Sequence, residues 1–413
     1  MVVVPLRSVA HDLPSPSVEV VAPSAVAAPV AVLPGRGVAL VAEVAAAHAA
    51  QVDKESRFPH ESMTALREQK LLGSMIPIAH GGQGWSVRQV AAACCKLARS
   101  CSSTAMVYAM HQIQVACLVA HHGNTPGMLA FLAKVADEQL LLASVTSEAG
   151  VGGEVRRSQC AVTLEGDRVR FGKAAPSISY GRFADGLLVT ARRNVDAEPS
   201  DQVMVVVERA DYALKQLGTW DALGMRGTST EAFELEIDTR AAQIMPTPFS
   251  VVASDTMLPV SHLLWCALWI GIAADAVDRA RAFLRKQQSR EGVSGGPGVA
   301  RFAEAVERLA LAQARVNHSL DGYSLGVTAD SALPLIRTAD VNSLKSSISD
   351  ICLGVAQSAL SVCGFSGYRN DTPYSVGRHL RDLNSSVLMV HNDRVREGTG
   401  RLLLARLPEL GIV

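Results

Sequence analysis

The sequence predicts an α+β fold with three parts: an N-terminal helical domain, a middle β-barrel or β-sheet domain, and a C-terminal four-helix bundle. Residues 38–140 are rich in alanine and repeat apolar residues at helical spacing. Residues 141–245 contain short, alternating, β-branched segments separated by turn residues. Residues 246–413 return to long helical runs, several of them apolar around much of their circumference, as in a bundle core.

Each domain has its own local signals. In the N-terminal domain, alanine-rich helical stretches at residues 37–55 and 87–123 flank "MIPIAHGGQGWS" (75–86), whose proline and glycines predict a loop. In the middle domain the predicted strands are "CAVTLEGDRVRFG", "FADGLLVTARR", "DQVMVVVERA" and "AFELEIDT". The main C-terminal helices are predicted at residues 258–288, 298–320 and 342–364.

Composition excludes several classes of protein. The 413 residues include 39 basic and 39 acidic side chains, so no charge excess points to nucleic acid. Eight cysteines without a C-x-x-C pair indicate reduced, cytoplasmic thiols and no metal site. No apolar run is judged long enough to span a membrane. Residues 1–37 are rich in Val, Ala and Pro and are predicted to be a disordered arm, not a signal peptide.

The most specific stretch is "WDALGMRGTSTEAFELE" (220–236), a glycine-punctuated turn that leads into a strand. Together with the order of helices, strands and helices, it resembles the acyl-CoA dehydrogenase family, in which W-D-x-x-G-M-R-G-T closes the middle domain. Three more stretches extend the resemblance over about residues 38–410: "RFPHESMTALREQKLLGSMIPIAHGGQGWS", "LASVTSEAGVGGEV" and "CGFSGYRNDTPYSVGRHLRD". The resemblance implies an FAD-dependent oxidoreductase with the acyl-CoA dehydrogenase-like fold.

The stretch "LASVTSEAGVGGEV" (142–155) is similar to the family's flavin-binding V-T-E-P-G-A-G-S-D segment. Hydroxyl groups and bare backbone N–H groups can hydrogen-bond the isoalloxazine edge and the pyrophosphate. The resemblance therefore implies cofactor contacts from Ser144, Thr146, Gly152 and Gly153. Ala149 replaces the usual proline and one residue is inserted, so a plain β-turn is the alternative.

Further cofactor contacts are predicted in "GKAAPSISYG" (172–181), which is similar to the family's G-x-K-x-W-I-T strand. The tryptophan that would stack on the flavin is missing, and Ala175 or Pro176 lies near its place. Ser177 fits the threonine position, and Ser179 is a second candidate. The resemblance thus implies FAD with altered packing on one face.

In this family the catalytic base is the glutamate of an E-G-T near the C-terminus. Counted from Arg381-Asp382, a predicted structural ion pair, that position is Val390, about two helical turns before Glu397. Glu397 is predicted inside the final helix on a solvated face. His391 is the nearest proton acceptor and the predicted catalytic residue, with simple exposure as the alternative.

Three other residues near the expected cleft are candidates. Asn392 is predicted to contact the cofactor or to cap the final helix. Some branches of the family place the carboxylate on the long helix after the β-domain, where this chain has Ser261 and His262. His262 and His111 are predicted to contact substrate, with core packing as the alternative for His111.

Three functions stay open. The first is α,β-desaturation of an acyl thioester, on CoA or a carrier protein, by an FAD enzyme with an atypical base. The second is a flavin-dependent monooxygenase of the same fold that uses reduced flavin and O2. The third is a non-catalytic binding protein with a degenerate flavin site. The expected partners are an acyl thioester and an electron-transfer flavoprotein or flavin reductase.

The run "LLWCALWIGIAADAV" (263–277) is too apolar for a solvent-facing helix. Exposed apolar surface of this extent usually marks an interface. The run therefore predicts a homotetramer, or a homodimer, built through the C-terminal helices.

Overall fold

The computed structural model describes residues 35–291, 295–324, 334–405 and 407. The predicted arm, residues 1–37, lies outside the described residues except for its last three. Two of these three already belong to the first helix, which begins at Arg36.

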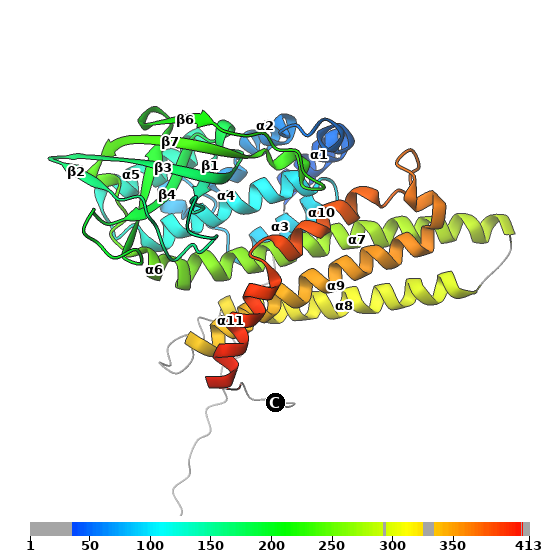
Figure 1. The fold of residues 1–413 in the computed structure, drawn as a ribbon. Coiled ribbons are helices and arrows are strands. Elements are labelled where there is room, and N and C mark those ends of the chain that lie inside the picture. Colours follow the sequence, from blue (N-terminus) through cyan, green and yellow to red (C-terminus); the bar gives the residue numbers. More distant parts are fainter. Residues whose placement is uncertain (1–34, 292–294, 325–333, 406, 408–413) are drawn as a thin grey trace, which may run out of the picture. The chain divides into compact units, whose positions relative to one another are not determined.

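Five α-helices make up the N-terminal part of the chain (Figure 1). Helix α3 starts with a capping box, in which the side chains of Ser86 and Gln89 each bond the backbone N–H of the other. Helix α4 is buried on nearly every side. The elements are α1 (Arg36–Glu55), α2 (His60–Glu68), η1 (Leu71–Gly73), η2 (Ile78–His80), α3 (Val87–Ala98), α4 (Ser102–His121) and α5 (Pro126–Glu138).

Two β-sheets follow. The first has the order β1-β4-β5, with β1 parallel to β4; the second is antiparallel, with the order β2-β3-β7-β6. Burial alternates along β3 and β7, so one face of the second sheet packs inward. The strands are β1 (Leu142–Val145), β2 (Thr163–Glu165), β3 (Arg168–Ser179), β4 (Gly186–Arg192), β5 (Gln202–Glu208), β6 (Tyr212–Gln216) and β7 (Thr230–Arg240).

The C-terminal helices are arranged around α7, which packs against α3, α4, α8 and α9 (Figure 1). A short π-helical turn, η7 (Ala253–Met257), precedes it, and Gly364 (φ 54°) interrupts α9. The helices are α6 (Phe249–Val252), α7 (Leu258–Glu291), α8 (Pro297–Ser324), α9 (Pro334–Tyr368), α10 (Gly377–Leu388) and α11 (Asn392–Ala405). The chain thus has the predicted order of helices, strands and helices.

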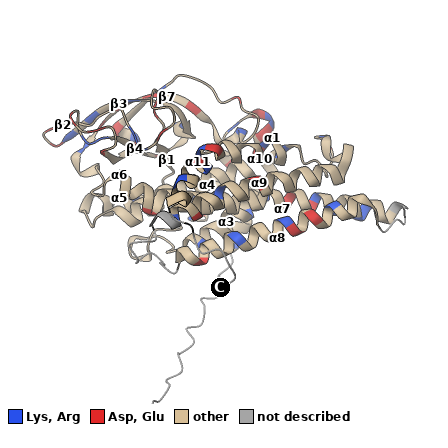
Figure 2. Ribbon diagram, turned by 60° about the horizontal axis from the view of Figure 1, so that its bottom comes forward, with Lys and Arg blue, Asp and Glu red and all other residues tan. Residues whose placement is uncertain are grey.

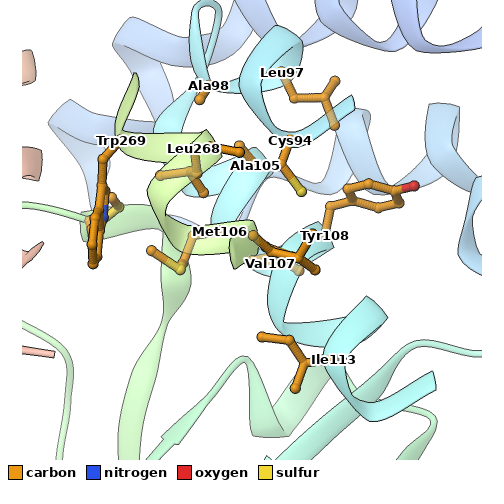
Figure 3. Packing of buried hydrophobic residues seen from close by; sticks show 14 of the residues in the cluster. Cys94, Leu97, Ala98, Ala105, Met106, Val107, Tyr108, Ile113, Leu268 and Trp269 are labelled. Atoms are coloured by element: carbon orange, nitrogen blue, oxygen red, sulfur yellow. The ribbon is translucent and has the colours of Figure 1, made fainter. Parts of the chain in front are cut away.

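The apolar run 263–277 lies in the core of the chain itself. Figure 3 shows Leu268 and Trp269 of α7 beside Ala105 and Met106 of α4, and all four are at most 1% exposed. Gly271 permits close contact with α3, because a Cβ there would lie 2.3 Å from the Cys95 carbonyl oxygen. The prediction that this run marks a subunit interface is therefore wrong.

Two helical segments are long and apolar enough to cross a membrane by length and composition, contrary to the sequence-based expectation: Phe249–Ser289 and Arg337–Tyr368. In the first, 83% of the apolar window is buried inside the fold, so internal packing accounts for its composition. In the second, 44% is buried. On α7 and α8, residues of both charge signs follow one another along the outer turns (Figure 2).

Asp382 of α10 joins three parts of the chain. Its carboxylate accepts hydrogen bonds from the Ser102 hydroxyl at the start of α4 and from Met225 N–H, the latter at 2.6 Å. Burial raises the pKa of Asp382 despite these bonds. Arg381 instead binds Asp53 of α1 through two bonds of 2.8 and 2.5 Å. The predicted ion pair between Arg381 and Asp382 is therefore wrong, because each residue has a different partner.

Candidate functional site

Strand β1 presents two of the predicted cofactor contacts on one side. Val145 is fully buried, whereas Ser144 and Thr146 on either side of it are partly exposed. Neither hydroxyl has a hydrogen-bond partner among the described residues, so both are available to a ligand.

The segment after β1 is tied to β3, which carries the next two candidates. The Ser147 hydroxyl donates to the Ser177 carbonyl at 2.6 Å. The β3–β7 register shifts between Ala175 and Ile178, and this bulge leaves Ser177 exposed. Ser179 differs, because its hydroxyl lies 2.9 Å from that of Thr230 and already has a partner within the sheet.

A buried ion pair fixes this end of the β-domain. Glu148 Oε2 lies 3.5 Å from Lys173 Nζ, and both side chains are at most 6% exposed. The carboxylate also accepts hydrogen bonds from the Ser158 hydroxyl and from the backbone of Cys160. Burial alone would raise the pKa of Glu148, but these bonds and the Lys173 charge lower it. Sequence reasoning passed over this pair, although each residue lies inside a segment quoted for the resemblance.

The glycine loop after β1 contacts the last helix. Gly152 and Gly153 have φ of +62° and +75°, a region that favours glycine. Their carbonyls accept bonds of 2.9 and 2.8 Å from the guanidinium of Arg394 in α11. Since Arg394 is three residues from His391, the two predicted halves of the site lie close together. Arg394 was missed because nothing in the sequence links it to the loop.

The connection between α10 and α11 carries Val390, the position predicted for the family's base. Val390 there has φ +47°, which is unusual for a β-branched residue. Its carbonyl accepts a 2.9 Å hydrogen bond from Lys345 Nζ of α9. Lys345 is fully buried and faces the Trp269 ring, 5.8 Å from its centroid. Burial lowers the pKa of Lys345 to about 8. The position predicted for the base is thus bonded to a buried lysine that sequence reasoning missed.

Asn392 belongs to the same buried cluster. Its Oδ1 accepts from Lys345 Nζ at 2.6 Å, and its Nδ2 donates to Ser349 Oγ at 2.9 Å and Asp350 Oδ1 at 3.2 Å. The residue is 3% exposed. Its amide donor group and its oxygen are thus bonded inside the bundle, and the cofactor contact from this side chain stays a prediction.

His391 and Glu397 both lie at the surface. The His391 side chain is 55% exposed, and its Nδ1 accepts from the Asp393 N–H at 3.3 Å. Glu397 is 64% exposed on α11 and pairs with Arg401 one turn later. The predicted place of Glu397, on a solvated face of the final helix, is confirmed.

The two predicted substrate-binding histidines are core residues. His111 bonds the Leu72 carbonyl through Nε2 at 2.8 Å, and its Nδ1 accepts from Leu142 N–H at 3.0 Å. His262 Nδ1 bonds the Val341 carbonyl at 3.2 Å, and neither side chain is exposed. Burial lowers the pKa of each to about 4. His111 thus has the core packing given as its alternative, whereas His262 Nε2 is buried without a hydrogen-bond partner among the described residues. The substrate contacts of the two histidines stay predictions.

Known proteins support the resemblance. A sequence model described as the N-terminal domain of acyl-CoA dehydrogenase matches residues 38–139. The short-chain-specific acyl-CoA dehydrogenase of Clostridium acetobutylicum is 22% identical over 346 residues, which cover 81% of this chain and 86% of that protein. The resemblance to the acyl-CoA dehydrogenase family is confirmed. Its predicted α+β fold class is confirmed as well.

Two solved structures share that fold. FMN-bound TdsC from Paenibacillus sp. A11-2, a dibenzothiophene monooxygenase, matches with a TM-score of 0.78 at 20% identity, covering 91% of this chain and 98% of TdsC. Butyryl-CoA dehydrogenase from Megasphaera elsdenii matches with a TM-score of 0.71 at 18% identity, covering 90% and 98%. Proteins with this fold therefore include both dehydrogenases and monooxygenases, and fold alone does not choose between them.

Proposed function

We propose that this chain is a flavin-dependent monooxygenase that takes electrons from a separate flavin reductase and adds one atom of O2 to a small organic molecule. The observation that supports this best is the base position. Val390 stands there, and its carbonyl is bound by a buried lysine.

The carboxylates in residues 381–405 are unsuited to desaturation. Asp382 is buried against Ser102 and Met225, while Asp393 and Glu397 are 84% and 64% exposed. Desaturation removes a weakly acidic proton, which requires a positioned base in a partly dry pocket. Oxygenation makes no such demand, because the new oxygen comes from O2.

The residues present fit a flavin. Ser144, Thr146 and Ser177 would bond the isoalloxazine edge, since their hydroxyls lie at the exposed ends of β1 and β3. Arg394, which pairs with carbonyls rather than a carboxylate, would lie beside a pyrophosphate together with the glycine loop. We therefore expect FAD. A bound reduced flavin supplies the two electrons with which O2 yields one oxygen atom for the substrate and one molecule of water.

The remaining roles belong to the α10–α11 connection. His391, exposed beside Val390, would donate or accept a proton at the substrate. Lys345 is a positioning residue, because it holds Val390 and Asn392 on either side of that histidine.

The test starts from flavin-reconstituted protein. Anaerobic mixing with a panel of acyl-CoAs should leave the flavin band unbleached. After reduction, exposure to 18O2 with a panel that includes dibenzothiophene and indole should give a product that carries one 18O atom. Bleaching by any acyl-CoA at a catalytic rate would overturn the proposal and favour desaturation.

Desaturation is the second candidate, because curated relatives that align over most of the chain, such as the Clostridium enzyme, are acyl-CoA dehydrogenases. In that case His391 would be the base and an electron-transfer flavoprotein the acceptor. Protein that binds no flavin after reconstitution would favour the third function, a non-catalytic binding protein.

We also propose a homotetramer or homodimer, on different grounds from the apolar run of α7. Phe365 and Tyr368 at the end of α9 stack on each other at 6.3 Å and are 73% and 70% exposed. Light scattering at micromolar concentration should give a mass at least twice that of the chain, and Phe365→Ser with Tyr368→Ser should lower it.

A further inference from the structure

A large cavity lies on the helical part of the chain. Its volume is about 1060 Å³, and it is bounded by α1, the end of α3, α7, α10 and residues 370–375. None of the residues assigned above to the flavin or to the α10–α11 connection lines it. A cavity of this size is sufficient for a ligand as large as a nucleotide.

The cavity wall is strongly basic. Seven lysine or arginine side chains line it against three aspartates, which leaves an excess of four positive charges. In a chain with equal numbers of acidic and basic residues, this local excess is notable. Several of the arginines are neutralised, as in the pair of Arg381 with Asp53. Lys54 and Lys96 have no partner among the described residues, and Arg378 bonds only the Ser100 carbonyl, at 3.2 Å. Three cations are thus free to bind an anion.

One buried histidine in the wall also lacks a partner. His379 is 4% exposed, and its Nε2 donates to Asp275 Oδ2 at 2.6 Å. Asp275 is fixed in turn by Arg279 Nε at 2.8 Å. Within the described part of the chain, His379 Nδ1 is buried without a hydrogen-bond partner.

The protonation of the His379 ring determines which hydrogen-bond partner its Nδ1 requires. Burial lowers the pKa of His379, although the Asp275 carboxylate acts against the shift. The neutral ring then carries its proton on Nε2, and Nδ1 is an acceptor that requires an O–H or N–H donor. A buried acceptor without a donor is unfavourable, so a group from outside the chain is expected there.

The geometry points to a second ligand site in this cavity, for a phosphorylated, hydroxyl-bearing molecule of nucleotide size. Its phosphates would contact Lys54, Lys96 and Arg378, and one of its hydroxyl groups would donate to His379 Nδ1. The inference does not depend on the proposed oxygenation, because the site shares no residue with the flavin cleft.

Calorimetric titration of the full chain with ADP and with inorganic pyrophosphate tests the site. Both should bind, and ADP more tightly, because only ADP can supply a hydroxyl to His379. Lys96→Glu should weaken both ligands by roughly tenfold or more, as expected for a lost hydrogen bond between charged groups. His379→Gln should weaken ADP but not pyrophosphate. Lys215→Glu, on β6 and outside the cavity, is the matched control.

A second ligand would offer the same phosphates and hydroxyl groups, namely the ADP half of an FAD bound to another copy of the chain. Titrations of flavin-free and FAD-loaded protein separate the two. Equal ADP affinity in both forms, with flavin content unchanged in Lys96→Glu, supports a separate site. No binding of ADP, unchanged affinity in Lys96→Glu, or loss of flavin from that variant overturns it.

Discussion

The two sides of the candidate site differ in what they share with the family. On the β side, Glu148 and Lys173 form a buried pair inside segments that match the family's flavin-binding pattern, and Ser144 and Thr146 face outward beside it. On the helical side, Val390 occupies the position predicted for the base. The residues predicted to contact the cofactor thus follow the family's pattern, whereas the residue at the predicted base position does not, and fold alone does not determine the reaction.

The largest effect is expected on the β side, from Lys173→Met. Removal of one partner leaves the Glu148 charge buried without its counter-ion, which costs about 3–5 kcal/mol. Urea unfolding followed by circular dichroism measures the loss. Lys215→Met, whose exposed lysine pairs with Glu234, should leave the midpoint unchanged. Equal urea midpoints for the two variants would show that the Glu148–Lys173 pair does not stabilise the β-domain.

The pair also has an acid dependence. The pKa of Glu148 is lowered in the folded chain from its ordinary 4.5. Its contribution to stability is therefore fully present above pH 4.5 and is lost as pH falls through the lower folded-state pKa. Between pH 6 and 3, the wild type should lose more stability than Lys173→Met.

On the helical side, Lys345→Met should lower turnover by roughly 10²-fold, since the loop that carries His391 loses its anchor. It should also destabilise the fold by about 1–3 kcal/mol for each buried acceptor left unpaired. Because the pKa of Lys345 is lowered to about 8, the folded chain releases this proton before the unfolded chain does. The stability of the wild type relative to Lys345→Met should therefore rise between pH 8 and 10. A stability difference that is flat with pH would place the lysine in a solvated setting.

His391→Ala tests whether the helical side of the candidate site supplies the proton donor or acceptor. A positioned proton donor or acceptor contributes about 10²-fold or more to turnover, so a loss of that size is expected with flavin content unchanged. If His391→Ala retains full turnover, the proton transfer belongs to another group.

Sequence alone predicted the order of the elements, because it follows from local periodicity, whereas Ser144 and Thr146 were named only through the resemblance to the family's flavin-binding segment. The histidines show what could not be predicted from the sequence. His111 and His262 lie among apolar residues on helices, the pattern of core positions, but only the structure shows that His111 is bonded through both ring nitrogens and His262 through Nδ1 alone. Lys345 and Asn392 are 47 residues apart, and nothing local in either stretch indicates that they meet.

A smaller effect is expected for the cofactor contacts. Ser144→Ala or Thr146→Val should weaken flavin binding by roughly tenfold, the scale of one lost hydrogen bond in a desolvated site. Ser179→Ala is the matched control, since its hydroxyl bonds Thr230. Fluorescence titration of flavin-free protein measures the affinities. If Ser179→Ala weakens binding as much as Ser144→Ala, the flavin lies farther along β3 than proposed.

The smallest effect is expected from Glu397→Gln, at the residue that matches the family's E-G-T by letters. Glu397 is 64% exposed, pairs with Arg401 on the same helix and lies about two helical turns beyond Val390. An exposed carboxylate cannot be both desolvated and close to a substrate carbon, so flavin content and turnover should stay within a few-fold of the wild type. Glu397→Ala gives the same expectation without an amide that could mimic the carboxylate shape. Loss of substrate-dependent flavin reduction in both variants, with His391→Ala unaffected, would make Glu397 the base. It would also show that the last helix moves when substrate binds, and desaturation would then replace oxygenation as the best-supported reaction.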